Sequence, residues 1–469
     1  MKKNDVIENL TVEKLVFGGK GFTRMEDGKV IFITGGAVPG SVVNVRIIKK
    51  KSGFIEGQII ETVKKSPLEK EANCDIFGLC GGCKWQTIDY AKQLEIKDAQ
   101  VKESLFHLAK YQENINIEAI EASPVIWGYR NKIEFSFGKF ISDKLGVRED
   151  FNVGFHKQAE FSKIVDCSYC HLIDTESNAV FKKIKEFAQK SGLPVYDQMR
   201  QSGFFRHLII RKAHFTNEMM LILGYNPKYD NGNFDLDSIK KFLLTLTKDF
   251  AEIKSIYLTS NANLADVALG DLELIYGNPV IVEELLGLKF EISPKSFFQT
   301  NSTGAEKLYS IVLDYADKEH LKDSTVLDLY AGTGTIGMTF APFAKEVYSV
   351  EMVSDASKDG EKNAILNNIT NMHFVNAKVE DFLKDFTQTG IKADLLIIDP
   401  PRAGMHPSAL PNILKFDAAQ MIYVSCNPAT LARDLEFILA NSQYKIEKLK
   451  AKDMFPHTHH IETVVSLKK

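Results

Sequence analysis

The sequence predicts an α/β protein with three parts: an N-terminal β-barrel, a mixed α/β central part and a C-terminal doubly wound domain. Two observations lead to this prediction. Residues 1 to about 65 alternate short β-branched runs with glycine turns, a pattern typical of a small barrel. From about residue 290, apolar strands and glycine turns precede helical stretches, as in TVLDLYAGTGTIGMTF and DLLIIDPPR. Strands this uniformly apolar belong to a parallel sheet that helices cover on both faces.

The N-terminal part, residues 1–65, contains one hairpin signal and one candidate binding loop. Asp27-Gly28 separates two alternating apolar runs, as a hairpin turn does. Lysines 49–51 stand close to Phe54, and basic side chains beside an aromatic ring suit a nucleic-acid backbone and a stacked base. The alternative is a solvated lysine loop without a ligand.

The central part, residues 66–290, begins irregularly and then becomes mixed α and β. A helix is predicted from about Tyr90 to Tyr111, because apolar residues recur there at helical spacing: Leu94, Val101, Leu105 and Leu108. The segments RNKIEFSFGKF and FFRHLIIRKAHF predict two of the strands. The doubly wound domain then occupies residues 291–469.

The composition limits the function classes. Of the 469 residues, 44% are hydrophobic and 25% are charged, which are ordinary values for a globular chain. No apolar stretch is long enough to span a membrane and the N-terminus lacks a secretion signal, so we expect a cytoplasmic protein without a membrane partner. The net charge of −3 means that any nucleic-acid surface must be a local basic patch.

The segment from Asp328 to Gly337, DLYAGTGTIG, indicates a nucleotide site. It lies at a strand-to-helix turn, where glycines let a ligand approach the backbone and the helix N-terminus. Glu351 ends the next strand, where a carboxylate can accept hydrogen bonds from ribose hydroxyls. Because the spacing also satisfies GxGxxG, these residues fit a nicotinamide dinucleotide as well as S-adenosylmethionine.

Two further motifs, Asp399-Pro-Pro-Arg402 and Ser425-Cys-Asn-Pro428, separate these cofactors. Ligands of open α/β sheets gather at the carboxyl ends of strands, so we expect both motifs in the crevice of the glycine turn. Hydride transfer needs neither motif. Cys426 lies between polar neighbours and a proline turn, which makes it a candidate nucleophile, although a cysteine at a strand end is more often an inert apolar residue.

A cysteine thiolate at this position suits one reaction in particular. Carbon 5 of uracil is a poor nucleophile, but a thiolate that adds to carbon 6 makes an enolate whose carbon 5 can attack a sulfonium methyl group. A general base must then remove the carbon 5 proton. Glu462, just before an apolar strand, is the candidate base, with His457, His459 and His460 as alternatives. Without further context, a glutamate that opens a strand is a surface residue.

The motifs SCNPATLARD, DPPRAG, FFQTN and DMFPHTHHIE together resemble the RNA uracil-5-methyltransferase family, and the N-terminal part resembles the TRAM domain, an RNA-binding fold. The resemblance covers almost the whole chain. It implies a Rossmann-like methyltransferase domain in which Cys426 is the nucleophile and Glu462 is the base. It also implies the residues that hold S-adenosylmethionine: Gln299, Tyr330, Glu351 and Asp399. Phe297, in FFQTN, is expected either to stack on RNA or to be buried.

Cys74, Cys80 and Cys83 form CxxxxxCxxC, a spacing that zinc or an iron-sulfur cluster could use with a fourth thiolate. The residue pattern alone does not choose between these metals. The resemblance implies a 4Fe-4S cluster, and IVDCSYCHL offers Cys167 and Cys170 as the fourth ligand, of which the family pattern favours Cys170. Because methyl transfer from a sulfonium moves no electrons, we expect the cluster to hold the fold and the RNA.

The resemblance implies 23S ribosomal RNA as the substrate, because the TRAM domain and the cysteines are more similar to the ribosomal branch of the family than to the transfer-RNA branch. A monomer is expected, since a single multidomain chain needs no symmetry to recognise RNA. A uracil-5-methyltransferase for transfer RNA is the alternative within the family. Three rival functions also stay open: a noncatalytic RNA-binding factor, a dinucleotide-dependent oxidoreductase and a methyltransferase for exocyclic amino groups. The oxidoreductase leaves SCNP and DPPR without a purpose, and amino methylation requires no thiol.

Overall fold

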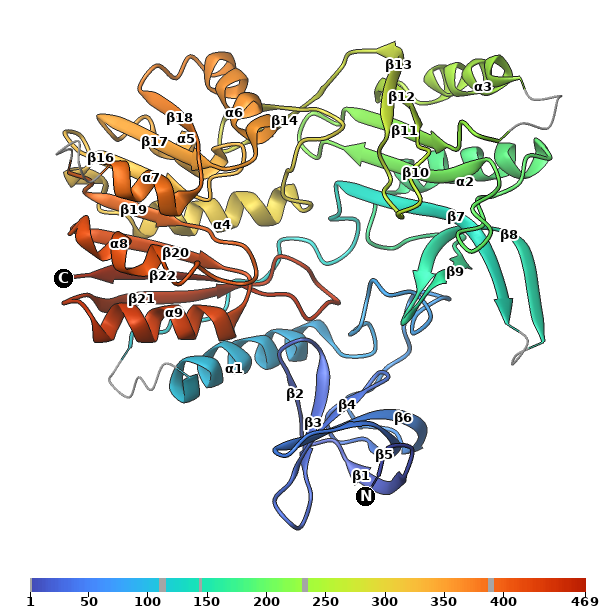
Figure 1. Cartoon of the computed structure of the whole chain (residues 1–469), viewed down its shortest axis with the longest axis horizontal. Helices are drawn as coiled ribbons and strands as arrows, with labels where there is room; N and C mark the ends of the chain where they lie inside the picture. Colours follow the sequence, from blue (N-terminus) through green and yellow to red (C-terminus); the bar gives the residue numbers. More distant parts are fainter. Residues whose placement is uncertain (1, 109–114, 143–145, 230–234, 387–391) are drawn as a thin grey trace.

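The computed structural model describes residues 2–108, 115–142, 146–229, 235–386 and 392–469 (Figure 1). The N-terminal part is a six-stranded sheet in the order β1-β5-β6-β4-β3-β2, curled around an apolar core. Its strands are β1 (Val6–Thr11), β2 (Lys14–Val16), β3 (Lys20–Arg24), β4 (Val30–Thr34), β5 (Val42–Lys50) and β6 (Phe54–Lys64). Asp27-Gly28 forms the predicted hairpin turn, because the Gly28 amide donates to the Met25 carbonyl and β3 pairs with β4.

The segment that carries the first three cysteines joins the N-terminal sheet to the rest of the chain. Trp85 is 1% exposed and completes the core of the N-terminal sheet. Helix α1 (Tyr90–Leu108) follows as predicted, while its predicted end at Tyr111 lies outside the described residues. Val101 and Leu105 of α1 are buried against the C-terminal domain, where α1 packs along α9 (Pro428–Ala440).

The central part is a seven-stranded mixed sheet in the order β13-β12-β11-β10-β7-β8-β9. Its strands are β7 (Lys132–Ser142), β8 (Val147–Lys157), β9 (Glu160–Asp166), β10 (Phe205–Lys212), β11 (Met219–Tyr225), β12 (Ile253–Ser260) and β13 (Asp271–Gly277). Helices α2 (Thr175–Lys190) and α3 (Leu236–Asp249) pack on this sheet and bury Val180, Phe181 and Leu243 against it. The two predicted strands are β7 and β10, and a hairpin of β14 (Ile281–Leu285) and β15 (Leu288–Ile292) leads to the next domain.

The C-terminal part is the predicted doubly wound domain, a seven-stranded sheet in the order β18-β17-β16-β19-β20-β22-β21. Its strands are β16 (Thr325–Leu329), β17 (Glu346–Glu351), β18 (Met372–Asn376), β19 (Leu395–Ile398), β20 (Gln420–Ser425), β21 (Lys445–Lys452) and β22 (Glu462–Lys468). Its other helices are α4 (Ser302–Tyr315), the 3-10 turn η2 (Lys318–His320), α5 (Thr335–Phe340), α6 (Ser354–Leu366), α7 (Val379–Phe386) and α8 (Ala409–Lys415). Ile397 and Ile398 of β19 are both fully buried, one in each of the two cores that flank the sheet, which explains the uniformly apolar strands.

One strand of this sheet runs against the others. β16 to β20 pair in parallel, whereas β22 lies antiparallel to β20, with Thr463 opposite Ser425. The beginning of β22 therefore lies at the edge where β20 ends. Among the described residues, no helix has the length and apolar composition that a membrane-crossing helix needs.

Candidate active site

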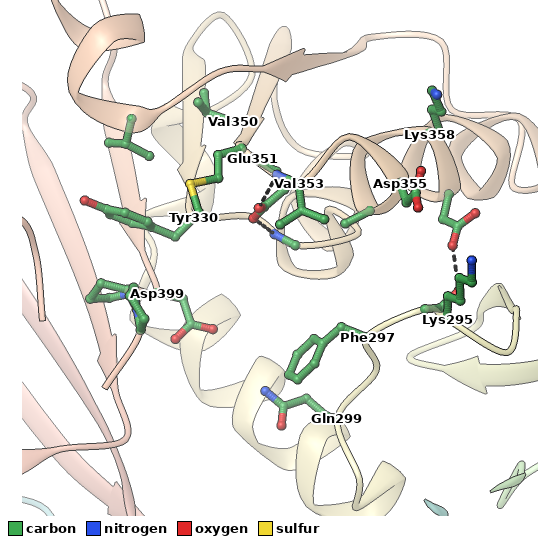
Figure 2. Close-up of a pocket in the computed structure, with 18 of the residues that line it drawn as sticks. Lys295, Phe297, Gln299, Tyr330, Val350, Glu351, Val353, Asp355, Lys358 and Asp399 are labelled. Carbon is green, nitrogen blue, oxygen red and sulfur yellow. Dashed lines mark hydrogen bonds between the residues drawn. The ribbon is translucent and has the colours of Figure 1, made fainter. Parts of the chain in front are cut away.

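A cavity of about 2230 Å³ opens at the carboxyl edge of the C-terminal sheet. It is lined by the residues that follow strands β16, β17, β19 and β20, by the segment 293–300 and by the start of β22. All six residues expected to bind the cofactor or carry the reaction line it: Gln299, Tyr330, Glu351, Asp399, Cys426 and Glu462. Figure 2 shows the first four of them around one open space.

The glycine turn after β16 requires residues without a side chain. A Cβ atom on Gly337 would lie 2.7 Å from Asp328 Oδ2 and 2.8 Å from Ser349 Oγ. The Gly337 amide instead donates to Asp328 Oδ2 over 2.9 Å, which holds the start of α5 on the strand below it. Tyr330 has a φ of 62° and directs the chain from β16 into the turn that borders the cavity.

Glu351, at the end of β17, is held by one backbone amide from the glycine turn after β16 and one from the turn that follows β17. Its carboxylate accepts a hydrogen bond from the Gly332 amide over 2.9 Å and one from the Val353 amide over 2.8 Å (Figure 2). A carboxylate has about four acceptor sites, so both oxygens can still accept hydroxyl groups of a ligand. This geometry suits the ribose of a nucleoside cofactor.

Asp399 follows β19 and faces the cavity with an acidic group that is costly to ionise. Burial, followed by repulsion from Asp328, raises the pKa of Asp399 to about 7. A cationic ligand beside this group would favour its ionised form. The site is therefore electrostatically suited to a ligand with a positive charge, such as a sulfonium or an ammonium group.

Cys426 lies in a tight turn between β20 and α9. The Asn427 amide donates to Ser425 Oγ over 3.1 Å, and the Asn427 side chain caps α9 and donates to the Arg402 carbonyl over 2.9 Å. Burial raises the pKa of Cys426 to about 11, with further contributions from Glu462 and Asp399, while the Arg402 guanidinium lowers it. In the protein without ligands, Cys426 is therefore a protonated thiol.

Glu462 approaches Cys426 because β22 is antiparallel to β20. It is 8% exposed, and burial, followed by repulsion from Asp399, raises its pKa well above the ordinary value. A raised pKa makes a carboxylate a stronger proton acceptor near neutral pH. The geometry and the electrostatics of Glu462 both suit a general base.

The three neighbouring histidines are placed differently. Neither His457, His459 nor His460 lines the cavity. Burial first, and nearby cations second, lower the pKa of His457 and of His459 to about 4. Burial, followed by His459 and nearby cations, lowers that of His460 to about 3. The structure therefore favours Glu462 over these alternatives.

Phe297 projects into the same cavity with 66% of its surface exposed, so it is not a core residue (Figure 2). On the N-terminal sheet, the predicted loop places the Lys51 ammonium 5.6 Å from the centre of the Phe54 ring. Phe54 in turn contacts Phe32 edge to face at 5.4 Å, which extends the aromatic surface. Phe32 and Phe54 are half-buried, and partly accessible rings beside a cation suit stacked bases and phosphates.

The cysteines expected to bind a cluster come together from two distant segments. Burial, followed by the thiols of Cys170, Cys80 and Cys74, raises the pKa of Cys83 to about 12, so these four groups are close enough to interact. Among the described residues, no three His, Cys, Asp or Glu side chains form a group that could hold a metal ion. Cys167 is 1% exposed and packs in the core of the central sheet.

Sequence reasoning missed two features of the site. Cationic side chains lie among the acidic groups that line the cavity and could contact phosphates: Lys295, Lys358, Lys362, Lys378, Arg402 and Arg433. A fully buried ion pair between Lys97 and Asp453, 2.7 Å long, holds the loop that leads to Glu462. No local signal identifies either feature, because both depend on segments that are distant in the sequence.

Comparisons with known proteins agree with this site. The family described as tRNA (Uracil-5-)-methyltransferase matches residues 281–469, and the TRAM domain matches residues 7–60. The chain is 40% identical to an RNA methyltransferase of Clostridium tetani, over 100% of this chain and 99% of the relative. It is 36% identical to an RNA methyltransferase of Caldanaerobacter subterraneus, over 100% of both chains.

A solved structure extends the similarity to the whole fold. The tRNA (uracil-54, C5)-methyltransferase of Pyrococcus abyssi, in complex with S-adenosyl-L-homocysteine, superposes with a TM-score of 0.74 and 27% identity, over 98% of this chain and 100% of that one. Fold, cavity and relatives together define an S-adenosylmethionine-dependent RNA methyltransferase. The chain belongs to the RNA (uracil-5-)-methyltransferase family.

Proposed function

We propose that this enzyme methylates carbon 5 of a uridine in 23S ribosomal RNA through a covalent bond between Cys426 and the uracil ring. The observation that supports this most is the meeting of Cys426 and Glu462 in the cavity that Glu351 and Asp399 also line. An amino methyltransferase or a noncatalytic RNA-binding protein needs no thiol beside a buried carboxylate. Transfer RNA is the second candidate substrate, because the Pyrococcus abyssi relative is named as an enzyme for it.

The reaction begins when the thiol of Cys426 releases its proton to water in the open cavity, so that Glu462 stays free to accept a proton later. A positively charged sulfonium beside Asp399 would offset the negative charges that raise the pKa of Cys426, and the Arg402 guanidinium acts in the same direction. The thiolate then adds to carbon 6 of uracil, and the ring electrons move to carbon 5 and oxygen 4. Carbon 5 attacks the methyl group, the sulfur–methyl bond breaks, and S-adenosylhomocysteine is the leaving group.

The second half of the reaction releases the product. Glu462 takes the proton from carbon 5, and the electrons of that bond form the double bond between carbons 5 and 6. The bond between carbon 6 and sulfur breaks, so that Cys426 leaves as a thiolate and the aromatic character of the ring returns. Glutamine in place of Glu462 would stop the reaction at the methylated adduct.

RNA binding involves three surfaces in this proposal. The aromatic and basic face of the N-terminal sheet holds single-stranded RNA, the cations around the cavity bind phosphates, and Phe297 stacks on a base next to the target. A uridine within a base stack must be flipped out, which costs a few kcal/mol and is offset by these contacts. The enzyme would act as a cytoplasmic monomer.

A 4Fe-4S cluster held by Cys74, Cys80, Cys83 and Cys170 is part of the proposal. Its support is the mutual electrostatic effect of these thiols, which Cys167 shares, so that only the deeper burial of Cys167 favours Cys170 as the fourth ligand. When bound, the cluster would join two distant segments and move no electrons. We expect Cys170→Ser to lose iron and acid-labile sulfide in an anaerobic preparation, whereas Cys167→Ser retains them; the opposite result would make Cys167 the ligand.

The proposal is tested with RNA that contains 5-fluorouridine, because fluorine at carbon 5 cannot leave as a proton. Wild-type enzyme with S-adenosylmethionine should form a methylated complex with 23S RNA that survives denaturation, and Cys426→Ala should form none. An adduct on transfer RNA alone would assign the substrate to transfer RNA. Cofactor binding without an adduct on any RNA would refute the covalent mechanism.

A further inference from the structure

The loop of residues 453–461 connects β21 to β22 and ends directly before Glu462. His457 lies near its middle, is 2% exposed and has a φ of 65°, a conformation that few residues other than glycine and asparagine adopt readily. Since His457 does not line the cavity, the reaction itself gives no reason for a buried histidine in this conformation. The contacts of His457 indicate a structural reason.

The backbone of His457 forms hydrogen bonds with α1 and with the end of the first cysteine segment, residues 74–85. Its carbonyl accepts a hydrogen bond from the Lys84 amide over 2.9 Å and another from the Trp85 amide over 3.0 Å. Its own amide donates to Gln93 Oε1 over 2.8 Å. Because Lys84 directly follows Cys83, the position of the loop depends on the path of the cysteine segment.

Through Trp127, the imidazole of His457 is linked to the second cysteine segment, residues 167–171. The two rings stack with their centres 3.7 Å apart and an angle of 17° between their planes. Trp127 also packs edge to face against the ring of His171, with the ring centres 5.7 Å apart. His171 directly follows Cys170. Gln93 Nε2 lies 3.1 Å from His457 Nδ1, so α1 contacts the imidazole as well as the backbone of His457.

The two halves of the loop are held by different contacts. The first half is fixed without His457: Lys97 pairs with Asp453, the Asn301 side chain donates to the Met454 carbonyl, and the Tyr129 hydroxyl donates to the Pro456 carbonyl. The half that reaches Glu462 has a contact of its own, since the Thr458 hydroxyl donates to the Phe455 carbonyl over 2.7 Å, and the contacts of His457 join this half to α1 and to both groups of cysteines. Cys426 is held separately, by Ser425 and Asn427.

We propose that His457 is a positioning residue for proton abstraction, joining both cysteine segments to the loop that places Glu462. This inference rests on the proposed function, in which Glu462 is the base. Loss of the His457 contacts should displace Glu462 while Cys426 stays in place. The proton-abstraction step then slows more than thiolate addition and methyl transfer, so the methylated covalent complex accumulates on ordinary RNA.

The experiment compares full-length, anaerobically purified His457→Asn with wild type, since asparagine tolerates the positive φ but removes the stacked ring. Each protein is mixed with unmodified RNA substrate and S-adenosylmethionine, and the fraction of enzyme that remains bound to RNA after denaturation is measured together with turnover. We expect turnover to fall on the order of 10–100-fold while the covalent fraction rises severalfold. Glu462→Gln is the positive control for the trapped complex, and His320→Asn, an exposed histidine on η2, is the matched control that should behave as wild type.

Other outcomes would refute either the positioning role of His457 or the covalent mechanism. A His457→Asn variant that loses turnover and covalent complex in proportion, or changes neither, refutes the positioning role while the Glu462→Gln complex upholds the proposed function. If Glu462→Gln traps no complex either, the covalent mechanism itself fails. Should His457→Asn not fold, Trp127→Leu removes the same stacked pair from its other side and is expected to give the same trapped complex.

Discussion

Asparagine in place of Asp399 would test whether the cavity holds a carboxyl group that resists ionisation. Burial and the neighbouring Asp328 raise the pKa of Asp399 from its ordinary 3.8 to about 7. At about 1.4 kcal/mol for each pH unit, this difference corresponds to at most about 4 kcal/mol of folding free energy. It is an upper bound, because Asp399 is only partly buried and keeps contact with the open cavity.

The sign follows from where the proton is held. The folded protein keeps the Asp399 proton up to about pH 7, whereas the unfolded chain releases it near pH 4. The protonated Asp399 therefore favours the folded protein fully below pH 4, and this part of the unfolding free energy is lost as the pH rises through 7. Asp399→Asn has no such loss, so its stability relative to wild type should increase by at most about 2 kcal/mol between pH 5.5 and pH 8.

The assay is urea unfolding of both proteins at these two pH values, without cofactor. Asp355→Asn, the same substitution at another cavity-lining residue, is the matched control for the loss of one carboxylate. S-adenosylmethionine should stabilise wild type at pH 8 but not Asp399→Asn, because the cation loses its carboxylate partner. A stability difference between Asp399→Asn and wild type that is the same at both pH values would refute the reasoning, since Asp399 would then ionise normally in the folded protein.

Three further predictions concern single interactions. Glu351→Gln leaves one oxygen where two accept backbone amides, so the dissociation constant of S-adenosylmethionine should rise on the order of tenfold in calorimetry; an unchanged constant would remove Glu351 from the site. Alkylation of Cys426 by iodoacetamide, followed by peptide mass spectrometry without cofactor, should accelerate about tenfold for each pH unit from 7 to 9, because the pKa of the thiol is raised to about 11; a flat profile would contradict a resting thiol. Lys97→Met leaves the Asp453 carboxylate buried without its cation and should lower the unfolding free energy in urea by about 3–5 kcal/mol, most of which a second substitution, Asp453→Leu, should restore; a loss under about 1 kcal/mol would mean that water reaches the pair.

The strand, turn and helix pattern of the C-terminal domain was predictable because each element depends on its own residues. The position of Glu351 at a strand end, the hairpin at Asp27-Gly28 and the helix that begins at Tyr90 are all local features, and the structure confirms them. Periodicity reports which face of an element is buried, and glycine reports where the backbone must turn. Neither signal carries information about the partner of a strand.

The residue types of the site could be read from the chain alone: a glycine turn, two strand-end motifs with a carboxylate and a cysteine, and a glutamate before the last strand. The folded chain was needed to show that β22 inserts antiparallel beside β20, which brings Glu462 to the cavity of Cys426. The same holds for the electrostatic interaction of Cys170 with Cys83 and for the ion pair of Lys97 with Asp453. The physical reason is that burial and pairing between distant segments depend on the whole packed chain, whereas motifs and periodicity describe only neighbours along it.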